Sequence, residues 1–315
     1  MFRNIFGNGW VLAGIVAYAA SLALLWPNKS FGHGDAISEL LIFGVAFPVV
    51  AWLATLRAKP LVVTRQRNIA EIWLVFVCLL LATLYLIWGA TISETFVPAK
   101  WILLPQAKLF VVLARKLIVF VIVPFLLFRF IFGYRWRDFG VQWEGLRALV
   151  TDHLPVVLAL SAAILIFQFF LGGGAAPLRH GEFSARQLVI ALPLCFVWLF
   201  IEAGLVEEFF FRALVQERLA AWFKSEITGV ALMALLFGLA HAPGFILRHA
   251  GLEEAIGSNP SAADSIAYAI VVLSVGGIFF GVVWARTRNL FAVMFIHAAT
   301  DLLPNLKDFV ETWKI

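Results

Sequence analysis

Long apolar runs, separated by short polar connections, fill most of the chain. A run of about 17 to 25 apolar residues is long enough for a helix to cross the hydrocarbon layer of a membrane. Segments of this kind lie at 9–26, 38–56, 71–90, 115–132, 154–171, 187–210, 228–246, 266–285 and 290–306. Only a short turn at Asn289 separates the last two, which leaves the count at eight to nine spans. The pattern predicts an all-α fold, a polytopic transmembrane helical bundle.

The composition agrees with a membrane protein and argues against nucleic-acid binding. Hydrophobic residues make up 63% of the chain and charged residues 14%, against about 25% charged in soluble proteins. The net charge is +5, but Lys and Arg gather at the ends of the apolar runs and form no continuous basic face. The two cysteines, Cys78 and Cys195, lie inside apolar runs without a disulfide or metal-binding spacing. The expected partner is therefore the lipid bilayer, with no nucleic acid.

The distribution of Lys and Arg predicts the orientation. The first apolar run continues to Trp26, so we interpret it as an uncleaved span and not as a signal peptide. If the N-terminus, with Arg3, is cytoplasmic, four basic clusters fall on the cytoplasmic side. These clusters are Arg57, Lys59, Arg65 and Arg67; Arg129, Arg135, Arg137 and Arg147; Arg212, Arg218 and Lys224; and Arg286 and Arg288. A smaller group would lie outside and weakens the bias: Lys100, Lys108, Arg115 and Lys116. We expect an integral multi-pass membrane protein with a cytoplasmic N-terminus.

Three short patterns place ionisable side chains inside the apolar runs of the second half. They are EEFFFR from Glu207 and Glu208 to Arg212, FGLAH from Phe237 to His241, and HAATD from His297 to Asp301. A charge near the middle of a bilayer costs at least about 2.5 to 3.5 kcal/mol, so each group should have a partner or a function. Residues four apart share a face of a helix. The two residues that are four positions apart in each pattern should therefore lie close together.

The depth of these residues tests whether they can meet. With a rise of about 1.5 Å per residue, Glu207, His241 and His297 reach the middle of a hydrocarbon layer about 30 Å thick, provided that the sixth helix leaves it only beyond Arg212. This condition requires Arg212 to be buried. Glu208, one turn away, is expected to pair with it as a structural support. Glu207 then remains free to face the bundle interior.

A lone carboxylate beside two imidazoles is suited to activating water. Burial disfavours the charged carboxylate, and a neighbouring imidazole offsets this, which keeps a general base poised near neutral pH. The set therefore predicts hydrolysis, with Glu207 as the base.

Taken singly, the residues have plainer interpretations. An intramembrane His more often joins two helices by a hydrogen bond, and the three phenylalanines after Glu208 face lipid or pack inside. Glu202 is either a site residue or a contact of a loop. Four other histidines lie in or beside connections and are expected to be solvated: His33, His153, His180 and His249.

In this order on successive apolar runs, the patterns EExxxR, FxxxH and HxxxD resemble those of the CPBP family, the CAAX prenyl endopeptidases and their bacterial relatives, also called the ABI family. The resemblance covers residues 187 to 306. It implies two regions, N-terminal transmembrane helices over 1–150 and an intramembrane protease core over 151–315. It also favours a bacterial inner membrane as the location.

Carried over position by position, the resemblance implies that Glu207 activates water and that His241 assists it. His297 and Asp301 match the pair that stabilises the oxyanion of the tetrahedral intermediate. The prenyl endopeptidases usually have Asn where this chain has Asp301, and an ionised Asp cannot donate a hydrogen bond. Either Asp301 is protonated, or it orients His297.

The metal requirement is open within the family, whose members have been described both as metalloproteases and as glutamate-dependent hydrolases. Glu207, His241 and His297 would form an acceptable Zn ligand set with water in the fourth position. However, the sequence has no HExxH pair, and Glu207 can act as base only if it is not a ligand. We therefore expect that no cofactor is required, with Zn as the alternative.

The leading hypothesis is an intramembrane endopeptidase that hydrolyses a peptide bond of a membrane-associated protein or peptide, such as a prenylated protein or one with a leader or sorting signal. One alternative is a proton-coupled transporter, because buried Glu and His also form proton relays. A transporter would favour inverted repeats, which the sequence does not display. The other alternative is a non-catalytic membrane immunity or scaffold protein.

Overall fold

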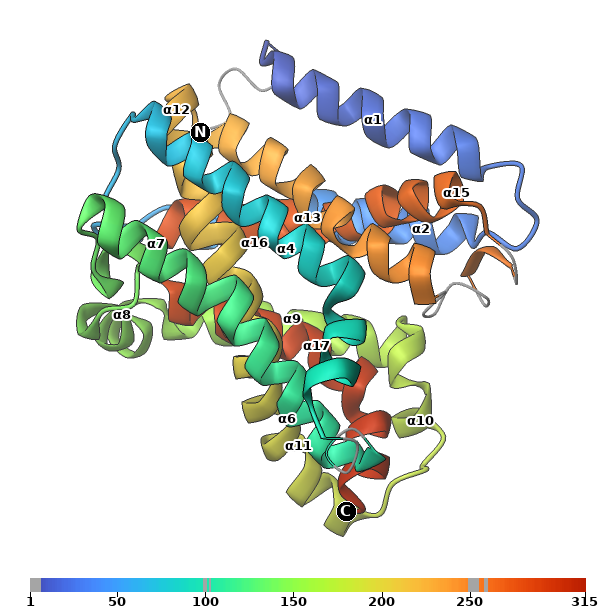
Figure 1. The fold of residues 1–315 in the computed structure, drawn as a ribbon. Helices are drawn as coiled ribbons and strands as arrows, with labels where there is room; N and C mark the ends of the chain where they lie inside the picture. Colours follow the sequence, from blue (N-terminus) through green and yellow to red (C-terminus); the bar gives the residue numbers. More distant parts are fainter. Residues whose placement is uncertain (1–6, 99–100, 102, 249–254, 258–259) are drawn as a thin grey trace. The chain divides into compact units, whose positions relative to one another are not determined.

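The computed structural model describes residues 7–98, 101, 103–248, 255–257 and 260–315. Over these residues the chain forms helices and turns and no strand (Figure 1), so the predicted all-α fold is confirmed. Three residues named above, Arg3, Lys100 and His249, lie outside the described residues.

Seven helices of the described chain are long and apolar enough to cross a membrane. They are Ala36–Ala54, Ile69–Gly89, Pro105–Phe132, Trp143–Phe170, Ala185–Phe223, Glu226–Leu247 and Ala262–Thr287. The first predicted span is the shorter apolar helix α1 (Gly9–Leu25). The ninth lies on α17 (Leu290–Trp313), which forms a helix but is not among the seven. Large apolar side chains point outward, as in Phe130 (80% exposed) and Val189 (76% exposed), which suits contact with lipid.

The chain divides into two compact units. The first comprises Met1–Arg57, Val63–Gly89 and Phe211–Arg288, and the second comprises Ala58–Val62, Ala90–Phe210 and Asn289–Ile315. The three motifs are thereby distributed: Glu207, Glu208, His297 and Asp301 belong to the second unit, and Arg212, Phe237 and His241 to the first. The predicted division into 1–150 and 151–315 rests on the extent of the motifs and stays a prediction.

The first unit is organised around α13 (Glu226–Arg248), which packs against α1 and against α12 (Glu217–Phe223). It also packs against the helical run formed by α15 (Ala262–Tyr268), the π-helical turn η8 (Ala269–Leu273) and α16 (Ser274–Thr287). The remaining elements of this unit are α2 (His33–Glu39), η1 (Leu40–Ala46), α3 (Phe47–Ala54), most of α4 (Ile69–Phe96) and most of η7 (Glu208–Gln216). Buried ion pairs join distant segments: Arg218 Nε lies 3.6 Å from an Oε atom of Glu71 at the start of α4.

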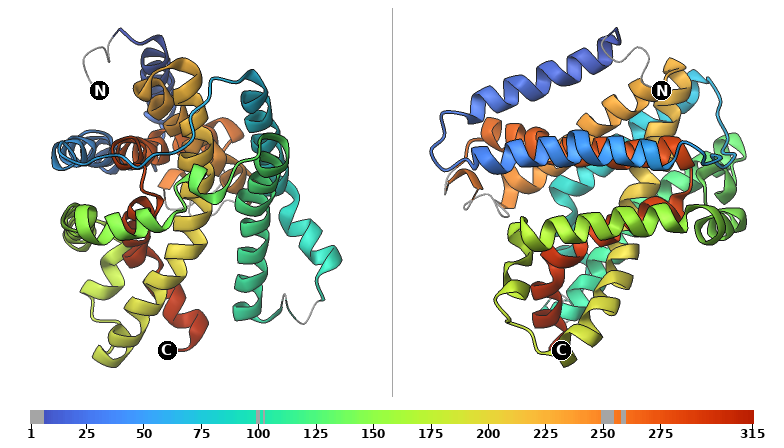
Figure 2. Two further views of the ribbon diagram at one scale, coloured as in Figure 1. Left: turned by 90° about the vertical axis from the view of Figure 1, so that its left-hand side faces the viewer. Right: turned by 180° about the vertical axis from the view of Figure 1, so that it is seen from behind.

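The second unit is organised around α17, which packs against α9 (Leu154–Phe170) and α11 (Ala185–Leu199), seen in both views of Figure 2. The α11–α17 contact buries Ala191, Cys195 and Leu199 with Ala298, Leu302 and Leu306. The other elements are α6 (Pro105–Lys116), η2 (Leu117–Ile122), α7 (Val123–Phe132), η3 (Trp136–Phe139), α8 (Trp143–Ala148), η4 (Leu149–His153), η5 (Gly173–Ala175), α10 (Ala176–Arg179) and η6 (Phe200–Leu205).

Asn289 is the N-cap residue of α17, and its hydrogen bonds bear on the predicted exposure of His153. Its side-chain Oδ1 accepts a hydrogen bond from the Ala292 backbone N–H, and its Nδ2 donates to the Gly145 carbonyl and to Nδ1 of His153. His153 is therefore buried, only 2% exposed, and the expectation that it is solvated was wrong. The helical run begins at Trp143, ten residues before it, so His153 lies inside a helix and not in a connection. His180 is exposed, as predicted, whereas His33 is half-buried and packs against the rings of Trp26 and Phe31.

Pro304 interrupts the hydrogen bonding of α17 just after Asp301. A proline has no N–H, so it cannot donate to the carbonyl four residues earlier, which belongs to Thr300. Nε2 of Gln168 on α9 donates to that carbonyl. A side chain from a neighbouring helix thus satisfies a backbone group that the apolar surroundings would otherwise leave without a partner.

Candidate active site

The two glutamates lie at a short α-helical step between two π-helical turns. The turn η6 ends at Leu205, Val206 and Glu207 are α-helical, and η7 (Glu208–Gln216) begins at the second glutamate. A π-helical turn inserts extra backbone into a helix and is often found at functional sites. Here it changes the directions of neighbouring side chains within one continuous helical run.

A glycine allows this run to approach α17 closely. A Cβ atom added to Gly204 would lie 2.9 Å from the carbonyl oxygen of Met294, which is closer than real Cβ contacts. Gly204 precedes Glu207 by three residues, and Met294 precedes His297 by three residues. The close approach at this level therefore helps to bring the glutamates and His297 together.

His297 is held between carboxylates on both of its ring nitrogens. Its Nδ1 lies 2.6 Å from Oε1 of Glu208, within hydrogen-bond distance. On the other side of the ring, Nε2 lies 3.4 Å from Oδ2 of Asp301 and 3.9 Å from Oε2 of Glu207. A carboxylate oxygen only accepts, so Nδ1 carries the proton of the bond to Glu208. Nε2 is the nitrogen that faces the other two carboxylates.

Exposure separates the two glutamates. The side chains of Glu208 and His297 are 0% and 5% exposed, whereas those of Glu207 and Asp301 are 18% and 32% exposed. The sequence predicted different neighbours for the adjacent glutamates. The structure places both at the same imidazole, on opposite nitrogens, with only Glu207 accessible.

In the first unit, Phe237 links Arg212 and His241. The Cζ atom of Arg212 lies 4.6 Å from the centre of the Phe237 ring and 5.6 Å from that of Phe280, a cation–π arrangement. Arg212 is 0% exposed, so its predicted burial is confirmed. The expected pairing of Arg212 with Glu208 joins residues of different units and stays a prediction.

His241 is oriented by its own helix. Its Nδ1 lies 2.8 Å from the Phe237 carbonyl oxygen, and the two rings are 5.0 Å apart. A carbonyl oxygen only accepts, so Nδ1 carries the proton and Nε2 keeps its lone pair. Next to Phe237, Gly238 allows the α13 backbone to approach α16: an added Cβ would lie 2.3 Å from Oγ of Ser274. The hydrogen bond fixes the orientation of the imidazole and leaves Nε2 as its acceptor nitrogen. That His241 acts together with Glu207 stays a prediction.

Other candidates have packing roles. The three phenylalanines after Glu208 are buried: Phe209 contacts the rings of Trp136 and Phe139, and Phe210 that of Phe120. Of the two sequence interpretations for these phenylalanines, packing is the correct one.

Glu202 forms an ion pair with Lys116 at the end of α6, so its contact is to a helix and not to a loop. No spacing pattern in the sequence indicated this pair, because its members lie 86 residues apart.

The residues that the structure describes contain no group of three or more His, Cys, Asp or Glu side chains arranged to hold a metal ion. The alternative Zn set of Glu207, His241 and His297 joins residues of different units and stays an untested alternative, and no step below passes through a metal. That the reaction needs no cofactor stays a prediction.

Comparison with known proteins gives one match. Residues 189–303 match the family model described as type II CAAX prenyl endopeptidase Rce1-like. No curated protein and no solved structure matches the chain. The matched segment contains all three motifs, from Glu207 to Asp301.

Proposed function

We propose, on the premise that residues 189–303 belong to the CPBP/CAAX protease family, that this integral membrane protein is an endopeptidase that cleaves a membrane-associated protein or peptide. The observation that carries the proposal is the placement of His297. One ring nitrogen is bound to a fully buried carboxylate, and the other faces two accessible ones. In this arrangement the His297 ring is a fixed proton donor or acceptor, and the Glu207 carboxylate beside it can act as a base.

Glu207 is the proposed base. Its Oε2 is 3.9 Å from His297 Nε2, too far for a direct hydrogen bond, so this carboxylate is available to a water molecule. Glu207 takes a proton from water while the water oxygen attacks the peptide carbonyl carbon and the carbonyl electron pair moves to its oxygen. When the oxyanion returns its electron pair to carbon and the C=O bond reforms, the C–N bond breaks and its electron pair goes to nitrogen, which receives the proton from Glu207. His241 is proposed to assist through Nε2.

His297 is the proposed oxyanion donor. With Nδ1 donating to Glu208, a second proton on Nε2 makes this nitrogen a donor toward the developing negative oxygen. Glu208 fixes the ring and offsets its charge, and is therefore a positioning residue. Asp301 Oδ2, 3.4 Å from Nε2, supports the second of the two roles left open for it, which is to orient His297.

The substrate is proposed only as a class. A membrane-associated protein or peptide can bring a peptide bond to residues placed on apolar helices, and a prenyl group, a leader or a sorting signal would each provide the anchor. We also propose the bacterial inner membrane, with a cytoplasmic N-terminus, as the location.

The decisive test compares Glu207→Gln with Glu311→Gln, an exposed control of the same chemistry near the end of α17. Membrane peptides from cells that produce each variant are identified by mass spectrometry with N-terminal labelling. Cleavage products should accumulate with the parent protein and the control, and disappear with Glu207→Gln at equal protein level. Unchanged products with Glu207→Gln would reject the mechanism, and proton flux through liposomes without cleavage would indicate the transporter.

A further inference from the structure

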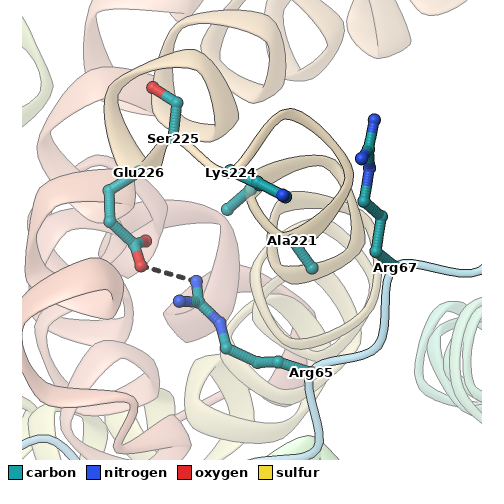
Figure 3. Close-up of a pocket in the computed structure, with 7 residues that line it drawn as sticks. Arg65, Arg67, Ala221, Lys224, Ser225 and Glu226 are labelled. Atoms are coloured by element: carbon teal, nitrogen blue, oxygen red, sulfur yellow. Dashed lines mark ion pairs between the residues drawn. The ribbon is translucent and has the colours of Figure 1, made fainter.

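A surface pocket of about 350 Å³ lies within the first unit, where a polar loop meets the turn between α12 and α13. Figure 3 shows Arg65 and Arg67, contributed by the loop, and Lys224, Ser225 and Glu226, contributed by the turn. Its volume is at the lower end of the range for ligand pockets, about 300 to 1,000 Å³. It suits a small polar group better than a whole lipid.

Part of the charge around the pocket is already balanced. Arg65 pairs with Glu217, and its Nη2 lies 2.6 Å from Oε1 of Glu226. Arg288 binds the same two carboxylates, with Nη2 also 2.6 Å from Glu226 Oε1. Burial lowers the pKa of Arg65, but Glu217 and Glu226 outweigh burial and the net pKa is raised. Two arginines and two glutamates thus neutralise one another.

Arg67 and Lys224 are the unbalanced charges. In the described part of the chain, neither forms an ion pair with a carboxylate. The Cζ atom of Arg67 lies 5.2 Å from the centre of the Trp222 ring, which holds the guanidinium by a cation–π contact. Lys224 caps the end of α12 in a left-handed conformation, with φ 52°. The pocket therefore has an excess of two positive charges.

The hydroxyl group of Ser225 adds a neutral donor. Its Oγ accepts the backbone N–H of Thr228, and a hydroxyl has one further proton of its own to donate. Two cations and one O–H donor form a set of the kind that binds phosphate oxygens.

The position of the pocket favours a lipid headgroup as the source of the phosphate. The apolar helices that flank it end or begin beside it: one begins at Ile69, one ends at Phe223, one begins at Glu226 and one ends at Thr287. From the ends of these helices we infer that the pocket lies where the apolar layer ends, at the level of lipid headgroups. Basic pockets at the cytoplasmic ends of membrane helices bind anionic headgroups.

We propose that this pocket binds the phosphate group of an anionic phospholipid, through Arg67, Lys224 and Ser225. A bound headgroup would join the loop after α3 to the α12–α13 turn, because its phosphate contacts both. The stability of the first unit would then depend on the lipid composition of the membrane. This site is separate from the residues of the proposed reaction.

The test uses the full-length protein in detergent and measures binding of three probes: short-chain phosphatidylglycerol, short-chain phosphatidylcholine and inorganic phosphate. The double variant Arg67→Gln/Lys224→Gln is compared with Arg57→Gln/Lys59→Gln, which removes two exposed charges from the same loop. Each Lys or Arg near a membrane surface strengthens the binding of an anionic lipid. Losing two of them should weaken phosphatidylglycerol binding by about tenfold to thirtyfold. The control should bind as the parent does.

The outcomes separate the proposal from its competitors. Phosphatidylglycerol should bind more tightly than phosphatidylcholine and raise the unfolding temperature of the parent. The variant Arg67→Lys/Lys224→Arg, which keeps both charges, should retain binding and thus distinguish a lost site from a misfolded protein. Equal weakening in the two glutamine double variants, no preference for phosphatidylglycerol, or equally tight binding of inorganic phosphate would overturn the proposal.

Discussion

The backbone carbonyl of Met294 approaches Gly204 so closely that a Cβ atom on residue 204 would lie 2.9 Å from its oxygen. One helical turn further along each segment stand Glu207 and His297, whose side chains form part of the candidate site. The absence of a side chain at residue 204 therefore sets the distance between the two helices that carry the proposed base and the proposed oxyanion donor.

Gly204→Ala should separate these helices. The added methyl group forces the backbone to shift, and overpacking of this kind costs about 1 to 3 kcal/mol. We expect a lower unfolding temperature in detergent and loss of most of the cleavage. Gly276→Ala is the control, because an added Cβ there meets nothing within 4 Å, and it should behave as the parent. Full activity of Gly204→Ala would show that the close approach is not needed.

Glu208→Ala should leave His297 without the acceptor at Nδ1. Hydrogen bonds to charged groups contribute about 1.5 to 3 kcal/mol, so the variant should be less stable by about this amount and nearly inactive. Glu208→Gln keeps an acceptor oxygen and should recover stability more than activity, because it removes the negative charge beside the imidazole. Thermal unfolding and cleavage rates measured on both variants test this; equal recovery of the two would contradict the positioning role.

Two substitutions of Asp301 test whether cleavage needs its side-chain oxygen or its negative charge. Asp301→Asn keeps an oxygen that faces His297 and adds an N–H donor, so it should retain cleavage. Asp301→Ala removes the oxygen that orients His297, and loss of an oxyanion donor such as His297 lowers kcat by about 100-fold to 1,000-fold, which is the upper limit expected for this variant. The kcat values of the two variants, compared at equal pH, are the measurement. Inactive Asp301→Asn would mean that the negative charge itself is required.

Gln168→Leu should show what happens when the Thr300 carbonyl, which cannot bond to Pro304, also loses its bond to Gln168. The Thr300 carbonyl would lose the hydrogen bond that Gln168 donates from α9, and an unsatisfied buried backbone group costs about 1 to 3 kcal/mol. We expect reduced stability of α17 and reduced cleavage, read by thermal unfolding and by the same peptide assay. Gln66→Leu, in an exposed loop, is the matched control and should change neither.

Metal removal should leave the activity intact. Because Glu207 can act as the base only if it is not a metal ligand, treatment with a strong Zn chelator should not reduce cleavage, and added Zn²⁺ should not restore a Glu207→Gln variant. The assay is cleavage of a membrane peptide in proteoliposomes before and after dialysis against the chelator. A loss that Zn²⁺ alone reverses would reject the metal-free mechanism.

The sequence predicted the features that depend on local pattern. Apolar length predicted most of the spans, and the depth at which the three motifs must meet predicted that Arg212 is buried, as it is. The four-residue spacing predicted the proximity of His297 and Asp301. These inferences need only one helix at a time.

Features that depend on which helices pack together were not predictable. Nothing in the spacing indicated that Glu208 binds His297, 89 residues away, or that Gln168 donates to Thr300. His153 was misjudged because the boundary of its helix was placed too late along the chain. The π-helical turns around Glu207 also change side-chain directions in a way that a regular helical repeat does not describe.

The ion pair between Glu71 and Arg218 has a consequence for biosynthesis. The arginine is translated 147 residues after the glutamate (218 − 71), which at typical elongation rates is a delay of roughly 7 to 30 s. During this interval the segment that begins at Ile69 has been synthesised, but the Arg218 side chain that lies beside Glu71 in the folded chain has not. The buried contact between Glu71 and Arg218 can therefore form only after the helix that carries Arg218 has been synthesised.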